Sequence, residues 1–526
     1  MKLKFKLNDT GDGLIVKGSK ELCGELVIPS EYECEGKNYP VTEIGTAAFS
    51  MNNLTSIVIP NSVVKIGLSA FSGCRYLYSV VIPNSVRIIG HNAFSGCWSL
   101  SSIIIPNSVK ELGKGMLWGC VNLSSIIVDK GNSHYDSRNN CDAIIETATN
   151  TLIFGCASTI IPKSVIRIKE NAFYLCQKLT SIIIPDSVVE IEDDAFANCS
   201  RLTSLFIPES LTKIGNGAFS NCSNLTSINV DQRNNCYDSR NDCNAIIETA
   251  TNTLIVGCST TVIPNSVMRI GRGAFRGCSN LSSVIIPDSV ITIGMIAFYG
   301  CLGLTSVVIP SSVDIIEERI FANCENLTTI DVDKGNRLYD SRDNCNGIVE
   351  TVTNTLIAGC PKTVIPNSVV KIGTGAFAEI TNLNSIVIPD SVTEIEDYAF
   401  SKCSDLKSII IPNSVTKIGR FAFQDCSNLK SVIIPDSVTK IDEYTFLGCS
   451  NLTSVVIPNS VKEIGDGAFQ SCEGLTTIVI PESVTNIGEG AFDYCYALEK
   501  IVINDATLLG NPKIGKNIEI TKHIVS

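Results

Sequence analysis

The chain has 526 residues, a formal net charge of −12 and a 6% share of aromatic residues. The acidic balance disfavours a nucleic-acid-binding protein, because such a protein needs a basic face to displace counterions from phosphates. The hydrophobic fraction of 44% supplies a core and excludes a disordered chain. No stretch approaches the roughly 20 apolar residues of a transmembrane helix, so no membrane insertion is expected.

Residues 1–43 precede the regular part of the chain, and we expect them to form an N-terminal cap. The segment from Gly24 to Pro29 is a degenerate first repeat within this cap. Basic residues follow Met1, but they are not followed by the apolar stretch of an export signal.

A 23-residue repeat fills residues 44–503. The unit at 452–474 contains the pattern Leu-x-x-Val-x-Ile-Pro, which predicts a short β-strand that ends at a proline. Its second half, Gly-x-x-Ala-Phe-x-x-Cys, predicts a single helical or 3-10 turn that points Phe and Cys inward. Because one such unit cannot bury its own core, the units must stack as a solenoid.

Three inserts interrupt the repeat near residues 129–160, 231–262 and 333–364. Each contains Tyr-Asp-Ser-Arg, then Cys, then two apolar runs separated by Thr-x-Thr-Asn. This pattern predicts a β-hairpin. The Asp-Ser-Arg step either binds a ligand or forms a local turn with an Asp–Arg pair, and internal duplication accounts for its recurrence without a function.

Residues 504–526 lack the repeat pattern. We expect them to cap the far end, because an uncapped solenoid leaves its last core layer exposed.

The repeat Leu-x-x-Ile-x-Ile-Pro-x-Ser-Val-x-x-Ile-Gly-x-x-Ala-Phe-x-x-Cys resembles the BspA-type leucine-rich repeat. The resemblance covers about 460 residues, roughly 44 to 503. It implies a right-handed solenoid with parallel strands on a concave face, and it places the short turns and the hairpin inserts on the convex side. It also implies non-enzymatic binding, often by bacterial surface proteins that adhere to host proteins or to other cells.

Within each strand the named apolar residues face the core, and the intervening residues face the concave side. The residue between the two Ile positions forms an aliphatic column beside a column of Ser and Thr. High β-propensity explains this composition equally well. The predicted protein-binding residues are Val58, Val81, Ile104, Ile127, Ile183, Phe206, Asn229, Ile285, Val308, Asp331, Val387 and Ile410.

The 23 cysteines predict a ladder of buried thiols rather than a disulfide framework. Side chains stacked on successive coils stand about 4.8 Å apart, which is wider than the Cβ separation of a disulfide. Disulfides across the inserts stay open as an alternative for the pairs Cys141/Cys156, Cys243/Cys258 and Cys345/Cys360.

No metal, cofactor or catalytic site is expected. The three histidines lie far apart, and the sequence has neither Cys-x-x-Cys nor a Gly-x-Ser-x-Gly elbow. The sequence therefore predicts a non-enzymatic, monomeric solenoid that binds a protein ligand. We expect a cell-surface or secreted adhesin or receptor from the resemblance. The alternative is an intracellular scaffold or inhibitor, which the thiols favour and which places the protein in the cytoplasm if Met1 is the native start.

Overall fold

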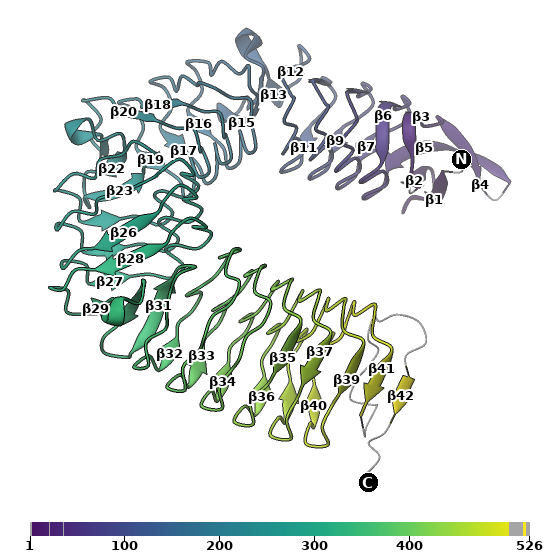
Figure 1. The fold of residues 1–526 in the computed structure, drawn as a ribbon. Coiled ribbons are helices and arrows are strands. Elements are labelled where there is room, and N and C mark those ends of the chain that lie inside the picture. Colours follow the sequence, from purple (N-terminus) through teal and green to yellow (C-terminus); the bar gives the residue numbers. More distant parts are fainter. Residues whose placement is uncertain (1–2, 20, 35, 504–518, 522–526) are drawn as a thin grey trace. The chain divides into compact units, whose positions relative to one another are not determined.

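The computed structural model describes residues 3–19, 21–34, 36–503 and 519–521 (Figure 1). The chain divides into two compact units. The first holds residues 1–250 and 256–261, and the second holds residues 251–255 and 262–526. Each unit is a β-solenoid built from stacked coils. The expected C-terminal cap at 504–526 lies outside the described residues, apart from the three residues of β42.

Each regular coil places its Leu-x-x-Ile-x-Ile segment in a first parallel ladder. The strands follow the repeat because alternate side chains enter the core. In unit 1 these strands are β3 (Cys23–Val27), β6 (Asn53–Val58), β8 (Ser79–Val81), β10 (Ser102–Ile105), β12 (Ser125–Val128), β18 (Ser204–Ile207) and β20 (Ser227–Val230). In unit 2 they are β26 (Ser306–Ile309), β28 (Thr329–Val332), β35 (Ser431–Ile433), β37 (Ser454–Val456), β39 (Thr477–Val479), β41 (Lys500–Val502) and β42 (Glu519–Thr521).

The Ser-Val-x-x-Ile segment of each coil forms a second parallel ladder of mostly two-residue strands. Unit 1 contributes β2 (Leu14–Gly18), β5 (Lys37–Ile44), β7 (Lys65–Ile66), β9 (Ile88–Ile89), β11 (Glu111–Leu112), β15 (Thr151–Gly155), β16 (Arg167–Ile168), β17 (Glu190–Ile191) and β19 (Lys213–Ile214). Unit 2 contributes β24 (Arg269–Ile270), β25 (Thr292–Ile293), β27 (Ile315–Ile316), β31 (Thr355–Gly359), β32 (Lys371–Ile372), β33 (Glu394–Ile395), β34 (Lys417–Ile418), β36 (Lys440–Ile441), β38 (Glu463–Ile464) and β40 (Asn486–Ile487).

At the N-terminus, β1 (Lys4–Leu7) pairs antiparallel with β2, and β4 (Glu31–Cys34) pairs antiparallel with β5. The ring of Phe5 stacks on Tyr32 at 4.3 Å. These strands cover the first repeats, whose core begins at Leu14 and Val16.

The Gly-x-x-Ala-Phe-x-x-Cys segment is a run of tight turns and not the expected helical or 3-10 turn. The amide of Phe49 donates to the next coil at Ala70 O, whereas the amide of Ala48 donates within its own coil to Gly45 O. Successive amides alternate between these two partners. Ala47 and Met51 take φ values of 50° and 59°, which a right-handed helix does not allow. The turn thus adds a third line of hydrogen bonds between coils.

Beyond the N-terminal strands, the antiparallel pairs of the described residues lie in the three inserts. In the first, β13 (Tyr135–Asp136) pairs with β14 (Ala143–Glu146), and β14 pairs with β15. The third has the same arrangement of β29 (Tyr339–Asp340), β30 (Gly347–Glu350) and β31. The second contains β21 (Tyr237–Asp238), β22 (Ile246–Glu248) and β23 (Thr253–Val256). Each insert also carries a three-residue 3-10 helix: η1 (Arg138–Asn140), η2 (Arg240–Asp242) and η3 (Arg342–Asn344).

The coil that follows an insert lacks a regular first-ladder strand. The insert coil ends in a local turn in which Thr159 Oγ1 accepts a hydrogen bond from the Cys156 amide at 2.8 Å. The Ile160 amide donates to Cys141 O within the insert. The segment at 179–184 of the next coil is extended but forms no assigned strand.

Candidate functional site

The exposed line of side chains on the first ladder is the main candidate surface. At the end of β6, Ile57 is 3% exposed and the next residue but one, Ile59, is 6% exposed, whereas the intervening Val58 is 46% exposed. The same alternation repeats in the other coils, so the inside and outside faces are those expected from the repeat. We call the exposed line the aliphatic column. The structure exposes all twelve predicted members: Val58, Val81, Ile104, Ile127, Ile183, Phe206, Asn229, Ile285, Val308, Asp331, Val387 and Ile410.

Strand register brings neighbouring members of the column together. Ile104 lies opposite Ile127 across β10 and β12, and Phe206 lies opposite Asn229 across β18 and β20. In unit 2, Val387 and Ile410 form a parallel bridge. Adjacent members therefore stand about 4.8 Å apart and form a continuous line within each unit.

Three members of the column escaped the sequence analysis because the inserts lengthen the repeat. Ile160, Val262 and Val364 are strongly exposed, and each lies two residues before a repeat proline. The missed signal is this fixed distance to the proline, which holds although the spacing to the preceding member grows from 23 to 33 residues. In unit 1 the aliphatic column thus continues through the first insert coil at Ile160.

The column of Ser and Thr side chains beside the aliphatic column is called the hydroxyl column. Near the inserts, some of its hydroxyls already form hydrogen bonds. Ser125 Oγ donates to Asp142 Oδ1 of the first insert at 3.0 Å. In the second insert coil, Thr260 Oγ1 donates to Thr226 O at 2.6 Å. These hydroxyls support the inserts. Ser227 Oγ, of the same column, accepts a hydrogen bond from Asn229 Nδ2 at 3.2 Å.

The Asp-Ser-Arg steps form local ion pairs. Arg138 donates from Nε to Asp136 Oδ1 at 2.8 Å and from Nη2 to Oδ2 at 2.6 Å. Its Nη1 donates to Asn150 Oδ1 at 2.7 Å, which ties the step to the hairpin turn. Asp238–Arg240 and Asp340–Arg342 repeat the pair. The structure therefore favours the structural interpretation of this step over a ligand site.

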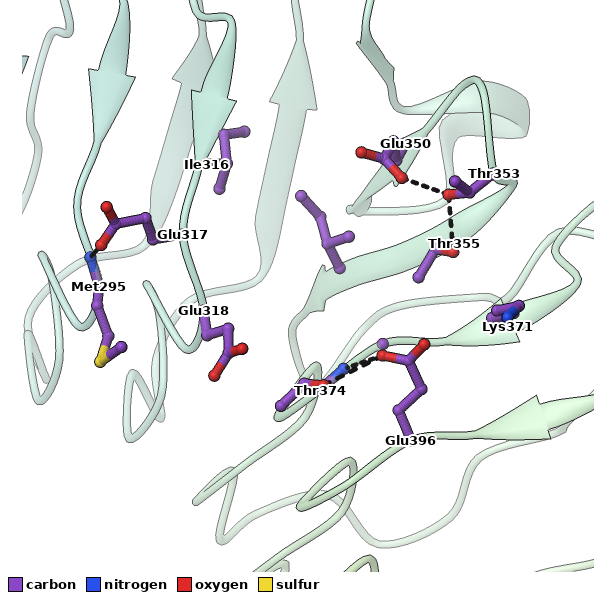
Figure 2. A pocket seen from close by; sticks show the side chains of 12 residues that line it. Met295, Ile316, Glu317, Glu318, Glu350, Thr353, Thr355, Lys371, Thr374 and Glu396 are labelled. Carbon is purple, nitrogen blue, oxygen red and sulfur yellow. Dashed lines mark hydrogen bonds between the residues drawn. The ribbon is translucent and has the colours of Figure 1, made fainter. Parts of the chain in front are cut away.

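A cavity of about 500 Å³ lies beside the third insert (Figure 2). Glu317, Glu318, Glu350 and Glu396 line it, together with Lys371. Three of these carboxylates already accept hydrogen bonds. Glu317 accepts from the Met295 amide at 2.7 Å, Glu396 accepts from the Thr374 amide at 3.0 Å, and Glu350 accepts from Thr353.

The equivalent position beside the first insert is nearly filled. Only about 40 Å³ is open there, next to Trp118. Lys114 and Glu170 close it with an ion pair of 2.6 Å, and the Trp118 ring lies 5.6 Å from Tyr174. The first and third inserts have the same backbone arrangement, so the difference in their side chains decides whether the cavity is open.

All 23 cysteines are free thiols, and most are buried. Cys74 Sγ donates to Phe49 O of the preceding coil at 3.0 Å, and the same bond recurs along both units. Cys156 Sγ donates to Asp142 O at 3.3 Å instead of bonding to Cys141. Burial raises the pKa of Cys74 to about 11, so this thiol is protonated and inert at neutral pH.

Within the residues that the structure describes, no cluster of three His, Cys, Asp or Glu side chains has the geometry to hold a metal ion. Over the same residues, no helix is long and apolar enough to cross a membrane.

Stacked parallel strands, an inward Phe and Cys column and an exposed strand face define a leucine-rich-repeat β-solenoid, a fold that is typically a protein-interaction scaffold. The chain belongs to the BspA-type leucine-rich repeat family, whose repeat region matches residues 42–150, 153–253, 255–346, 358–449 and 416–516. Members of this family are typically non-enzymatic repeat proteins. None of the curated proteins compared with the chain matches it.

Solved structures similar to the chain include a leucine-rich cell surface protein from Faecalibacterium prausnitzii A2-165. It is 25% identical, the match covers 86% of this chain and 92% of that chain, and the TM-score is 0.35. A leucine-rich repeat protein from Bacteroides ovatus ATCC 8483 is 22% identical, with 100% and 99% covered and a TM-score of 0.33. The pneumococcal vaccine antigen PcpA is 16% identical, with 99% of each chain covered and a TM-score of 0.24.

Proposed function

We propose that the protein binds a protein ligand through the aliphatic column and acts in adhesion or receptor-type recognition. The observation that carries the proposal is the exposure of large aliphatic side chains along one face of each unit, interrupted by Asn229 in unit 1 and by Asp331 in unit 2. Exposed apolar surface of this extent is uncommon on a monomer that has no partner. The twelve predicted residues serve as the contact positions, and no catalysis is involved.

An intracellular scaffold or inhibitor is the second candidate. It is favoured by the 23 free thiols, because reducing compartments keep cysteines free whereas exported proteins usually pair them. The two candidates share the binding face and differ in where the partner is found.

Phe206 is the natural anchor of the column, because it is the one aromatic member and is 49% exposed. We expect Phe206→Asp to weaken partner binding by more than about 2 kcal/mol, roughly 30-fold, since it sets an unpaired charge against an apolar partner surface. Folding stability should change by no more than about 1 kcal/mol. Lys407→Asp, an exposed change outside the column, is the control.

The test is a parallel pull-down from extracellular-matrix protein and from cell lysate, with the wild type and both variants as bait. A partner that is lost with Phe206→Asp but kept with Lys407→Asp supports the proposal, and its source decides between the two candidates. A partner that both variants retain would move the binding site away from the aliphatic column.

A further inference from the structure

The cavity beside the third insert lies at a break in the second ladder. Strand β27 ends one sheet, and the next sheet begins at β29 of the insert. The amide of Ile316, on the edge of β27, donates to the hydroxyl of Tyr339 at 3.3 Å, and this hydroxyl donates to Asp314 O at 3.3 Å. The insert thus satisfies the edge of β27 with a side chain. A space of about 500 Å³ remains, lined by residues of both β27 and β31, and cavities of this size hold small ligands.

Carboxylates face this cavity from two sides. Figure 2 shows Glu317 and Glu318 on one side and Glu350 and Glu396 on the other. Lys371 is the one cationic residue among the lining residues that the structure describes, and its ammonium group already pairs with Glu394 at 3.0 Å. The lining therefore has an excess of negative charge, which favours a cationic ligand.

Glu318 is the carboxylate with the greatest capacity for a ligand. Its side chain is exposed, and within the described residues it takes part in no hydrogen bond or ion pair. The side chains of Ile316 and Ile357 line the same cavity. A ligand that reaches Glu318 along these residues needs a positive charge at the end of an apolar stem.

The equivalent place beside the first insert contains such a cation from the chain itself. Lys114 stands two residues after β11, the position that Glu318 has after β27. The Lys114 ammonium pairs with Glu170 at 2.6 Å, and both residues line the small cavity there.

The backbone confirms that the two places correspond. The amides of Glu170 and Thr374 each donate to a glutamate of the next coil, at 3.1 Å and 3.0 Å. Glu318 and Thr374 therefore replace the ion pair of Lys114 and Glu170. The third insert keeps the site but lacks the lysine that fills it in the first.

We propose that the cavity beside the third insert binds an alkylammonium group, supplied by a lysine side chain of a partner protein or by a free alkyl diamine. The ammonium group takes the place that the Lys114 ammonium has beside the first insert, and Glu318 accepts its charge-assisted hydrogen bond. The alkyl stem lies along Ile316 and Ile357, as lysine stems do on apolar surface. This site shares no residue with the aliphatic column.

Isothermal titration calorimetry of the full chain at fixed ionic strength measures the binding. 1,5-Diaminopentane represents the free diamine, and acetyl-Gly-Lys-Gly-amide represents a lysine side chain of a protein. 1,5-Pentanediol has the same carbon chain as the diamine without its charge and is the reference. We expect the site's amine to bind at least about tenfold tighter than the diol, because the ammonium group meets carboxylates. Binding of the peptide assigns the site to protein lysines, and binding of the diamine alone assigns it to a free diamine.

Glu318→Gln removes one charge and keeps the shape of the side chain. We expect it to weaken binding of the amine about fivefold, the upper range for an exposed ion pair. Glu489→Gln is the matched control. Glu489 is also exposed and stands two residues after β40, the same position of its coil, but it lies outside the cavity. This variant should bind the amine as the wild type does.

The double variant Glu318→Lys with Thr374→Glu rebuilds the ion pair of the first insert. We expect the amine to bind at least about tenfold more weakly to it, because the chain's own ammonium group then occupies the cavity. Thermal unfolding checks that the double variant is folded, and Glu318→Gln provides the test if it is not.

Equal binding of the amines and the diol would overturn the proposal. Equal losses in Glu318→Gln and Glu489→Gln would also overturn it and leave only diffuse charge attraction. Calcium binding that Glu318→Gln abolishes, with no binding of either amine, would make the cavity a metal site instead. Phe206→Asp changes no residue of the cavity, so failure of the aliphatic column in the pull-down and failure of the cavity are separate results.

Discussion

At the residue scale, the inward Phe position contributes the largest fully buried side chains of both units. The rings stack coil on coil, with centroids 5.4 Å apart for Phe49 and Phe71 and 5.1 Å apart for Phe275 and Phe298. The stacks are interrupted at the inserts. Gly155 and Gly359 replace the aromatic residue there, and the rings of Phe173 and Phe377 lie over them.

Phe298 tests this packing, because it is fully buried between Phe275 and Phe321. We expect Phe298→Ala to lower the free energy of unfolding by about 3 to 5 kcal/mol through lost burial and a cavity. Urea unfolding measures the change. Ile285→Ala, at a side chain that is 86% exposed, should cost less than about 1 kcal/mol. Equal effects of the two changes would contradict the assignment of inside and outside.

The sequence predicted the regular residues well because two periods act together. The period of two within a strand places Ile57 in the core and Val58 on the surface. The 23-residue repeat gives the same alternation in every regular coil. Ile160, Val262 and Val364 were missed because each follows an insert that breaks the count. The stacking of Tyr398 on Phe421, with ring centroids 4.8 Å apart, was also missed, because it depends on a left-handed backbone conformation that the residue types do not favour.

At the element scale, the turns differ from the sequence prediction for a physical reason. A helix satisfies its own amides, whereas a coil in a stack has neighbours on both sides. Alternating amides of the Ala-Phe turn bond to the next coil, which left-handed residues such as Ala47 and Met51 make possible. A single unit of sequence contains no information about this neighbour, so the local pattern resembled a helical turn.

The Asp–Arg pair of the inserts has a measurable structural role. Arg342 pairs with Asp340 through two hydrogen bonds of 2.8 Å and donates to Asn354 at 2.7 Å. We expect Arg342→Ala to cost about 1 to 2 kcal/mol in urea unfolding, since it leaves a carboxylate and an amide without their donor. The matched control is Arg420→Ala, whose pair with Asp397 is more exposed and should contribute less than about 1 kcal/mol. A larger effect in the control would count against a structural role of the insert pair.

Gly359 is the point where the third insert meets the aromatic core. An added Cβ would lie 2.3 Å from Cε1 of Phe377, a ring packed among buried neighbours. We expect Gly359→Ala to destabilise the protein by about 1 to 3 kcal/mol through overpacking. Gly490→Ala would place its Cβ at ordinary contact distance, so its cost comes from the left-handed backbone at φ 63° and not from a clash. Thermal unfolding of the two variants side by side measures the difference, and a stable Gly359→Ala protein would show that the ring moves aside.

At the scale of the whole molecule, the repeat predicted the solenoid because every coil depends on its neighbours for burial. The repeat predicts the fold, but it does not predict the function in the same way. The aliphatic column follows from β-propensity as readily as from binding, and the open and filled cavities beside the third and first inserts differ only in side chains such as Glu318 and Trp118. These side chains depart locally from the repeat, and they make the surfaces of the two units chemically different.

Both units contain a column of buried cysteine thiols, so the stability of both depends on pH in the same way. Burial raises the pKa of Cys120 and Cys222 in unit 1 to about 12, and it raises that of Cys324 and Cys495 in unit 2 to about 12. An unfolded thiol ionises near its ordinary pKa of 9.0. Between these two values the unfolded chain releases protons that the folded chain retains, so rising pH favours unfolding.

We therefore expect the stability of both units to be constant below about pH 8 and to fall as the pH rises from about 9 toward 12. Each buried thiol contributes a loss of up to about 1.4 kcal/mol per pH unit within that window. The measurement is the free energy of unfolding in urea at pH 7, 8, 9 and 10, with a reductant present to keep every thiol free. Cys324→Ala should lower the slope by the share of one thiol, after allowance for the cavity it creates at every pH. A free energy that stays flat or rises up to pH 10 would mean that the folded protein ionises these thiols as easily as the unfolded chain does, and the buried thiol column would be wrong.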